Sequence, residues 1–304
     1  MSAVTQPLAG ALTAQTFLRA VDLSPVEPQV HDEAYEATTQ YVPWPKAYGG
    51  DMVAQAAAAM MRSVDADRCL HSMHSYFMRP VDIGAAVRYE VERLRDGRGY
   101  STRSVRGYQG GKVVYAAMGS FQVPEEGPEF QPAMPAAVDP ESLRSAAEAL
   151  EGVEGPAAEY WSAGRSFDMR HVPGPVYVQV EGERVPQQAV WVRAFDRLPD
   201  LADARSTADL HRTALAYVCD YTILEPILRV HGLAWADEGL ATASLDHAMW
   251  FHRDGRADDW VLYAQEAVSG QRNRGLALGR FFDRSGRLLA TVAQEGMIRA
   301  GRAH

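Results

Sequence analysis

The sequence has few of the residues that identify several large classes of protein. Two cysteines occur in 304 residues, Cys69 and Cys219, and their spacing fits neither a metal site nor a redox pair. So low a number is typical of a protein from a reducing cytosol, where disulfides are rare. No stretch reaches the ~18 consecutive apolar residues that a membrane helix needs. The sequence therefore predicts a protein without disulfides or a membrane span.

Basic charge is also in short supply. The chain has 30 Lys and Arg against 39 Asp and Glu, a formal net charge of -9. This negative charge opposes binding to nucleic acids and anionic membranes, although a local arginine cluster can still bind a small anion. Residues 1–14 lack the basic and apolar regions of a signal peptide, and residues 301–304 are not a peroxisomal address. We therefore expect a cytoplasmic protein with neither nucleic-acid nor membrane partners.

The composition that remains is that of an ordinary globular protein with a substantial core. Hydrophobic residues make up 47% of the chain and charged residues 23%. A length of 304 residues indicates about two domains of ~150 residues each. An Ala- and Met-rich segment at 51–64 predicts a buried helix, because its middle is apolar on every side. Turn signals then separate four predicted strands, at 71–79, 86–96, 101–109 and 113–123.

The stretch 124–158 differs in character and predicts a linker between two domains. It is rich in Pro, Glu, Ala and Gly, which are common in loops. Within it, Asp139-Pro140-Glu141 supplies an N-cap, a proline for the first helical position and a first-turn acid. We therefore expect a short surface helix that runs from there to Leu150.

The pattern of the first half returns after this linker. Strands are predicted at 167–172 and 189–195, a helix at 207–228, and then four strands at 241–252, 260–267, 275–283 and 288–299. A helix followed by four strands thus occurs twice, at an offset of roughly 170 residues, which indicates an internal duplication. We predict an α+β double hotdog, with two long helices each wrapped by an antiparallel sheet. Its parts are an N-terminal hotdog at 13–124, a linker at 125–158 and a C-terminal hotdog at 159–304.

The predicted strand 241–252 carries more polar groups than a core strand needs. The two-residue period puts Ser244 and Asp246 on one face and His247 on the other. No Gly-x-Ser-x-Gly elbow surrounds Ser244, which favours a hydrogen-bonding role over a nucleophilic one. No second histidine at ligand spacing accompanies His252. We therefore expect His247 and His252 to be hydrogen-bonded within the fold, and we expect no metal site.

Two other polar residues are predicted in apolar surroundings. Asp220 is the one charge in the helical segment 214–224, where poor solvation would raise its pKa toward the range of a general base. With equal weight, Asp220 could instead cap a kinked final turn ahead of Pro226. Gln294 is the one polar residue on an otherwise apolar face of strand 288–299. A buried Gln needs partners, so it could bridge parts of the structure or hold a water or a substrate carbonyl.

Two loops carry candidate substrate-binding groups. Arg272 and Arg274 lie beside glycines between two strands, where they either bind phosphates or are solvated turn charges. Gly49 and Gly50 open the first buried helix, and a Gly-rich helix start can direct backbone N–H groups at an anion or a carbonyl oxygen. This start is too short for a P-loop and lacks the lysine of one.

Five segments, taken in order, resemble a known family. They are 48–56, 71–80, 120–125, 244–253 and 294–296. On these segments the chain resembles the type II acyl-CoA thioesterases from about Phe17 to Arg299. The resemblance implies hydrolysis of acyl-CoA to a free fatty acid and CoA, without a metal, a cofactor or a covalent serine. It also implies a closed assembly, a homodimer or a homotetramer.

The resemblance further implies a site made of three residues. Asp220 matches the family's aspartate on the second helix, Ser244 stands where some members have Thr, and Gln294 matches the glutamine of the last strand. Asp220 would activate a water, and a direct attack by its carboxylate stays open as an alternative. An enoyl-CoA hydratase of the same fold would need an Asp/His pair, and a non-catalytic acyl-CoA-binding protein would not need all three residues. We expect one active site per chain, in the C-terminal hotdog.

Overall fold

The computed structural model describes residues 12–301, so most of the two terminal segments used to predict the compartment lies outside it. The first half opens with a short helix and contains one long helix and six strands. These are α1 (Gln15–Ala20), β1 (Ser24–Val26), β2 (Glu33–Thr38), α2 (Gly49–Arg62), β3 (Cys69–Phe77), β4 (Ala86–Asp96), β5 (Tyr100–Gln109) and β6 (Lys112–Gln122).

The second half follows four short helical segments. They are a 3-10 turn (Pro140–Ser142), α3 (Ala146–Ala149), α4 (Pro156–Glu159) and the π-helix Tyr160–Gly164. It again has six strands around a long helix, which is now followed by a shorter one. These are β7 (Phe167–His171), β8 (Gln187–Ala194), α5 (Ala204–Val218), α6 (Glu225–His231), β9 (Ala241–Phe251), β10 (Val261–Gln271), β11 (Arg274–Asp283) and β12 (Leu288–Arg299). The predicted strands and the first long helix are therefore confirmed, with ends that differ by a few residues.

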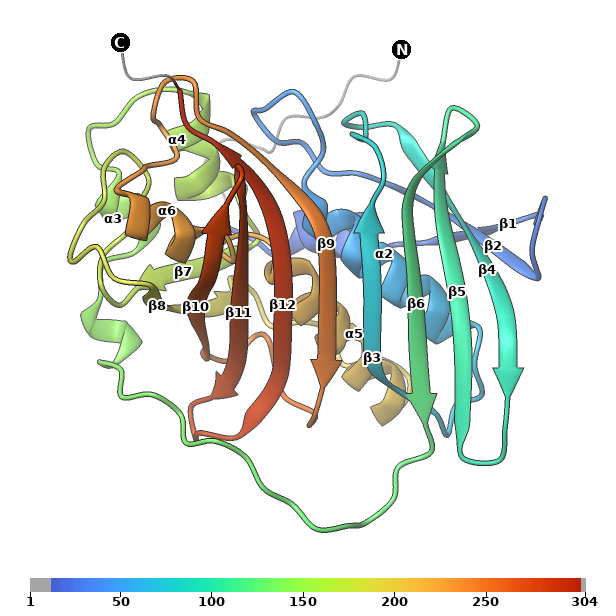
Figure 1. Cartoon of the computed structure of the whole chain (residues 1–304). Coiled ribbons are helices and arrows are strands. Elements are labelled where there is room, and N and C mark those ends of the chain that lie inside the picture. The colour runs from blue at the N-terminus through green and yellow to red at the C-terminus, as the bar shows by residue number, and fades with distance from the viewer. Residues whose placement is uncertain (1–11, 302–304) are drawn as a thin grey trace.

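The strands form one antiparallel sheet whose order is symmetric about its centre. The order is β1-β2-β4-β5-β6-β3 in the first half, followed by β9-β12-β11-β10-β8-β7 in the second. Each strand of one half has a counterpart at the mirrored place in the other, as an internal duplication requires. The halves join where β3 pairs with β9, with Ser75 opposite His247 (Figure 1). The predicted double hotdog is confirmed.

The two long helices pack against each other on one face of this sheet (Figure 1). Alanines such as Ala54 and Ala57 are fully buried in α2 and leave room for close packing. The hydroxyl of Tyr48 donates to the carbonyl of Tyr217 at 2.6 Å. This bond ties the beginning of α2 to the end of α5, and the candidate site lies where these two helix ends meet.

The helix predicted at 207–228 is wrong as a continuous element. It is α5, which ends at Val218, then a turn, then α6, which begins at Glu225. Pro226 lies in the first turn of α6 and has no N–H to donate, and its ring would collide with the carbonyl of Thr222 in an unbroken helix. The helix is therefore interrupted before Pro226, and Asp220 lies in the turn rather than on the helix.

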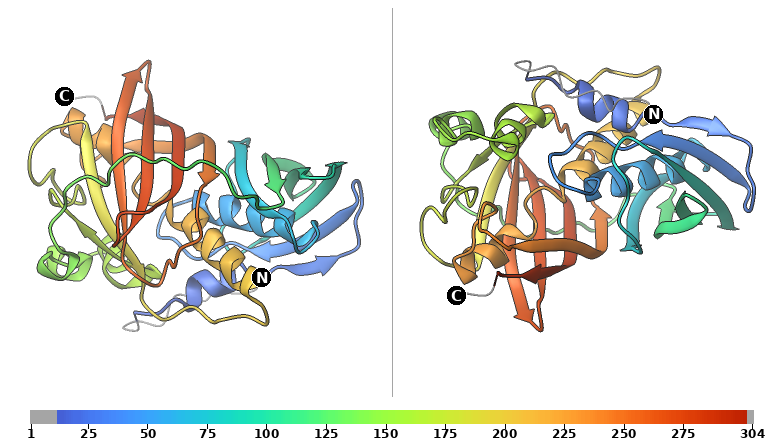
Figure 2. Two further views of the ribbon diagram at one scale, coloured as in Figure 1. Left: turned by 90° about the horizontal axis from the view of Figure 1, so that it is seen from below. Right: turned by 90° about the horizontal axis from the view of Figure 1, so that it is seen from above.

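The linker covers part of the outer face of the second half. Figures 1 and 2 show it leaving the end of β6 and running past the ends of the strands toward the edge of the sheet formed by β8 and β7. Trp191 donates its indole N–H to the carbonyl of Val138 at 2.9 Å, and Trp260 donates to Glu141 Oε1 at 2.8 Å. Both indoles belong to a small second core with Leu262. The linker therefore buries apolar residues on the face turned away from the helices.

The N-cap predicted in the linker is confirmed, but the helix it begins is shorter than expected. Asp139 Oδ1 accepts the N–H of Glu141 at 2.9 Å and starts a single turn over 140–142. A separate turn, α3, follows with its own capping box between Ser145 and Glu148. Among the described helices, none is long and apolar enough to span a membrane.

Candidate active site

Asp220 occupies the turn that follows α5, and strand β10 holds this turn in place. The hydroxyl of Tyr263 donates to the carbonyl of Cys219 at 3.0 Å. The Gln265 amide donates to Thr222 Oγ1 at 2.7 Å. Both donors are buried, so the turn is anchored on either side of Asp220. Asp220 as a whole residue is half-buried, although its carboxylate is poorly solvated.

Ser244 on β9 and Gln294 on β12 both donate to the same oxygen of Asp220. The distance from Ser244 Oγ to Asp220 Oδ1 is 2.8 Å, and the distance from Gln294 Nε2 to Asp220 Oδ1 is 2.6 Å. Gln294 Nε2 also donates to Ser244 Oγ at 3.0 Å, which closes a triangle of hydrogen bonds. The fold thus brings the three predicted residues together. Asp220 lies in a turn, however, and not on a helix as predicted, and the alternative prediction was that it caps a kinked final helical turn. Asp220 caps no helix, because α6 has no side-chain cap.

A β-bulge corrects the predicted faces of strand β9. In the pairing of β9 with β12, Asp246 lies opposite Glu295, but Ser244 lies opposite the next residue, Gly296. Leu245 is therefore an extra residue on β9, and the alternation of faces shifts there. As a result Ser244 lies on the same side as His247, not on the opposite side as the simple two-residue period predicts.

The second oxygen of Asp220 faces the beginning of helix α2. A Cβ atom at Gly49 would collide with Asp220 Oδ2, so only glycine allows this close approach. The backbone N–H of Gly50 also interacts with the carboxylate. The N-terminus of an α-helix attracts negative charge, because its first N–H groups have no partners within the helix. Gly49 and Gly50, predicted as substrate-binding residues, therefore border the site directly.

The surroundings of Asp220 alter its acidity in two opposed ways. Burial raises its pKa to about 6, because the ionised carboxylate is poorly solvated. Hydrogen bonds from Gln294, from Ser244 and from the Gly50 backbone oppose this rise. A carboxylate with such a pKa is ionised at neutral pH and yet basic enough to accept a proton from water.

His247 on β9 contacts the site through a hydrogen bond with Gln294 on β12. His247 Nδ1 lies 2.8 Å from Gln294 Oε1, and the two residues are direct partners across β9 and β12. His252 is also hydrogen-bonded, with its Nε2 2.9 Å from Thr291 Oγ1. Both histidines are therefore satisfied within the fold, as predicted. The contact of His247 with the site was missed, because the period placed it on the face opposite Ser244.

Arg272 and Arg274 lie apart from the three polar residues. Arg272 lies in the two-residue turn between β10 and β11, and Arg274 is the first residue of β11. Arg274 Nε pairs with Glu295 Oε1 at 3.1 Å. Together with His231 at the end of α6, they line a groove of about 420 Å³. This groove adjoins α6, the helix that follows the turn of Asp220.

Asp246 is placed away from the site. It lies on the outer face of the sheet, where its Oδ1 accepts the backbone N–H of Glu295 at 3.2 Å. Within residues 12–301, no group of three or more His, Cys, Asp or Glu side chains is arranged to hold a metal ion.

Comparisons with known proteins agree on one family. A family model described as acyl-CoA thioesterase matches residues 163–297, and one described as the acyl-CoA thioesterase N-terminal domain matches residues 41–122. Acyl-CoA thioesterase 2 of Haemophilus influenzae is 33% identical over 278 residues, which cover 89% of this chain and 94% of that protein. Human acyl-coenzyme A thioesterase 8 is 32% identical over 300 residues, which cover 95% of this chain and 91% of that protein.

A solved structure extends the agreement to three dimensions. The acyl-CoA thioesterase II TesB2 of Mycobacterium marinum superposes with a TM-score of 0.74 at 34% sequence identity. The match covers 94% of this chain and 99% of that one. Identity above 30% over nearly the full length of several relatives establishes common descent, and the chain therefore belongs to the acyl-CoA thioesterase family.

Proposed function

We propose that the protein hydrolyses fatty acyl-CoA to a free fatty acid and CoA, with Asp220 as the general base. The observation that carries this proposal is that the two carboxylate oxygens of Asp220 have different neighbours. Ser244 and Gln294 both donate to Oδ1, whereas Oδ2 faces the N-terminus of α2. Among the described residues no side chain donates to Oδ2, so this oxygen can accept a proton from a water in a fixed direction.

The proposed reaction begins with a water hydrogen-bonded to Asp220 Oδ2. As Oδ2 takes a proton, the water oxygen forms a bond to the thioester carbon, and the carbonyl oxygen becomes an oxyanion. The backbone N–H of Gly49, at the start of α2, is the proposed donor to this oxyanion. The C–S bond then breaks, and the sulfur of CoA leaves with the proton returned by Asp220. No metal, cofactor or covalent serine takes part.

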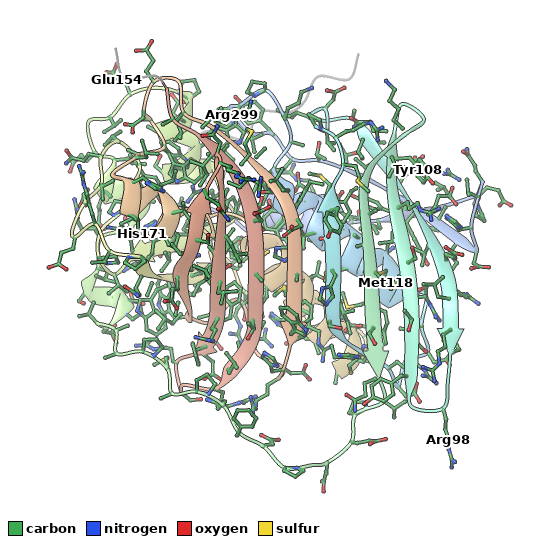
Figure 3. All side chains as sticks on the ribbon, viewed as in Figure 1. Arg98, Tyr108, Met118, Glu154, His171 and Arg299 are labelled. Atoms are coloured by element: carbon green, nitrogen blue, oxygen red, sulfur yellow. The ribbon has the colours of Figure 1, made fainter. Side chains whose placement is uncertain are left out.

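We assign the CoA nucleotide to the groove beside α6. Its arginines, Arg272 and Arg274, are exposed cations at the edge of this groove, next to the helix that follows Asp220. Phosphate groups suit such donors. Replacing both by alanine should raise KM for acyl-CoA with little change in kcat. Arg98→Ala serves as the matched control, because Arg98 lies at the tip of the β4–β5 hairpin in the other half (Figure 3). An equal change in KM in the control would remove the assignment.

The function is tested by following free CoA with a thiol-detecting reagent for acyl-CoA substrates of increasing chain length. Wild-type protein should release CoA at a rate that saturates with substrate, and Asp220→Asn should not. Release by neither protein would contradict the thioesterase assignment. Tight binding of acyl-CoA without release would instead support a non-catalytic binding protein.

A hydratase is the alternative reaction for this fold, and the contacts of Asp220 argue against it. Hydration of an enoyl-CoA needs a carboxylate and a histidine that act together on one water. Here His247 hydrogen-bonds Gln294, and Gln294 lies between it and Asp220. Incubation with a trans-2-enoyl-CoA should therefore leave the conjugated double bond, followed by its ultraviolet absorbance, unchanged.

We further propose that each chain carries one active site, in the part at 159–304, and that the chains assemble as a homodimer or homotetramer in the cytoplasm. Titration with a tight-binding CoA analogue should give one site per chain, and two sites per chain would contradict this.

Side chains such as Met118 are exposed on the outer face of the sheet and are available for contacts between chains (Figure 3). Light scattering at micromolar concentration tests the assembly, and a clean monomer mass would overturn it.

A further inference from the structure

His247 is a buried ring that the proposed reaction does not use. Its side chain is 1% exposed, and its Nδ1 lies 2.8 Å from Gln294 Oε1. Its other nitrogen, Nε2, lies 3.6 Å from Cys219 Sγ. Strand β3 holds its backbone, because Ser75 Oγ donates to the carbonyl of His247 at 3.0 Å. The ring is thus fixed from three elements, and it meets the candidate site at one atom of Gln294.

The hydrogen bonds around Gln294 admit one consistent assignment of donors. The amide nitrogen of Gln294 has two protons, and the geometry directs them at Asp220 Oδ1 and at Ser244 Oγ. Ser244 uses its own proton on Asp220 Oδ1. Gln294 Oε1 can only accept, so the proton in its bond with His247 must come from Nδ1. His247 is therefore the Nδ1–H tautomer.

This tautomer decides which way the Gln294 amide points. If the amide were turned by 180°, its NH₂ group would face the N–H of His247, and its carbonyl oxygen would face the carboxylate of Asp220. Both contacts would be repulsive, one between two donors and the other between two acceptors. In the buried setting of Gln294, which is fully inaccessible to solvent, no water can relieve either contact.

Protonation of the ring does not disturb this arrangement at ordinary pH. Burial lowers the pKa of His247 to about 4, and the nearby ring of His74 on β3 lowers it further, against the hydrogen bond with Gln294. The titratable group that faces Nε2 is the thiol of Cys219, at the end of α5, and burial raises the pKa of this thiol. Both groups are therefore neutral at neutral pH.

We propose that His247 is a positioning residue, whose Nδ1–H locks the Gln294 amide so that its NH₂ group holds Asp220 Oδ1 and Ser244. The proposal rests on the proposed function, since Asp220 is taken as the base. In this role His247 touches neither substrate nor water. It keeps the base in one orientation, and it excludes the flipped amide that would push the carboxylate away.

Three variants test whether the Nδ1–H group of His247 matters as a hydrogen-bond donor, separately from the space that the ring fills. In His247→Asn the amide nitrogen can stand close to the position of Nδ1, whereas in His247→Gln it extends toward the position of Nε2. His247→Leu has no donor. We expect kcat to fall about tenfold or more in His247→Leu and His247→Gln, with KM changed less than twofold, and to recover largely in His247→Asn. Equal losses in Asn and Gln variants, or an unimpaired Leu variant, would overturn the proposal.

A double-mutant cycle shows whether the effect passes through Gln294. In a Gln294→Ala background, His247→Leu should lower kcat less than twofold, because the amide that His247 positions is gone. The same loss of kcat in both backgrounds would mean that His247 acts by another route.

The pH profile of the rate gives a second readout. Loss of the lock weakens a bond that lowers the pKa of Asp220, so the acidic limb should move to higher pH in His247→Leu but not in His247→Asn.

A measurement that needs no substrate separates this proposal from the proposed function. Nitrogen-15 NMR of the wild-type imidazole should show the proton on Nδ1 of His247 between pH 6 and 8, and a proton on Nε2 would overturn the lock. If the protein hydrolyses no acyl-CoA, the proposed function fails while the tautomer is still decided. If it hydrolyses acyl-CoA and the tautomer is Nε2–H, the positioning role alone fails.

Discussion

Gln294 Nε2 lies 2.6 Å from Asp220 Oδ1, although the two residues are 74 positions apart in the chain. The contact joins the last strand of the sheet to the turn that Pro226 forces after α5. It makes Oδ1 the structural oxygen of Asp220 and leaves Oδ2 to the chemistry. The proposed reaction depends on this division of the two oxygens.

The first prediction concerns the base itself. Asp220→Asn should keep the fold, because an amide can accept the same bonds from Ser244 and Gln294, but it should lose about 100-fold or more in kcat. Asp51→Asn is the matched control, because Asp51 is a fully buried residue whose carboxylate, like that of Asp220, lies near the beginning of α2. Its Oδ2 accepts the backbone N–H of Gln40 at 2.9 Å rather than site residues. Steady-state kinetics should show near-wild-type rates for this control. Near-wild-type hydrolysis by folded Asp220→Asn would contradict the mechanism.

The second prediction concerns the pH dependence of the rate. Burial raises the pKa of Asp220 to about 6, and a general base must be ionised to accept a proton. The value of kcat/KM should therefore rise about tenfold per pH unit below pH 6 and level off above it. Stopped-time assays between pH 4.5 and 8 measure this limb. A profile that is flat down to pH 4.5 would show that no group with this pKa controls the reaction.

The third prediction concerns stability, and its sign follows from the same shift. A carboxyl group whose pKa is higher in the folded chain than in the unfolded chain favours folding at low pH, and this advantage is lost as pH rises through about 6. Asp220→Asn should therefore match the wild type at pH 4 and be more stable at pH 8, by at most about 3 kcal/mol at ~1.4 kcal/mol per pKa unit. Urea unfolding at pH 4, 6 and 8 measures the difference.

Asp51 gives the comparison for this third prediction. Burial raises the pKa of Asp51 to about 8, against its hydrogen bonds from Gln40 and with some help from the charge of Asp220. The advantage of Asp51→Asn over the wild type should therefore keep growing up to pH 8, whereas that of Asp220→Asn should level off above pH 6. A stability gap that does not depend on pH in either variant would show that neither carboxyl group is shifted as described.

Much of the fold could be predicted because each part leaves a local pattern. The buried helix α2 is apolar on every side, and hairpin turns separate the strands that follow it. The repeated order of a helix and four strands was enough to predict the double hotdog. The three site residues were found as polar groups in apolar surroundings, and the resemblance assigned them to one site.

The features that could not be predicted depend on contacts between distant segments. The bulge at Leu245 reveals itself only when β9 pairs with β12, so the faces of Ser244 and His247 were assigned wrongly. Pro226 was recognised in the sequence as a helix breaker, but the helix was predicted to continue to residue 228, whereas α5 already ends at Val218. The contact of His247 with Gln294 needed the register of the two strands, which no local pattern supplies.

The last prediction concerns the glycine that faces the base. A methyl group at Gly49 would overlap Asp220 Oδ2 and would also press on the ring of Phe77, 3.1 Å from the added carbon. Gly49→Ala should therefore displace the oxygen that activates water and close the space in front of it, with a fall in kcat of about tenfold or more. The fold should survive, because alanine is a better helix former than glycine. Gly127→Ala is the matched control, since an added carbon there meets no atom within 4 Å. Kinetics together with thermal unfolding of both variants measure the effect. A Gly49→Ala protein that keeps wild-type kcat would show that Oδ2 is not the working oxygen of Asp220.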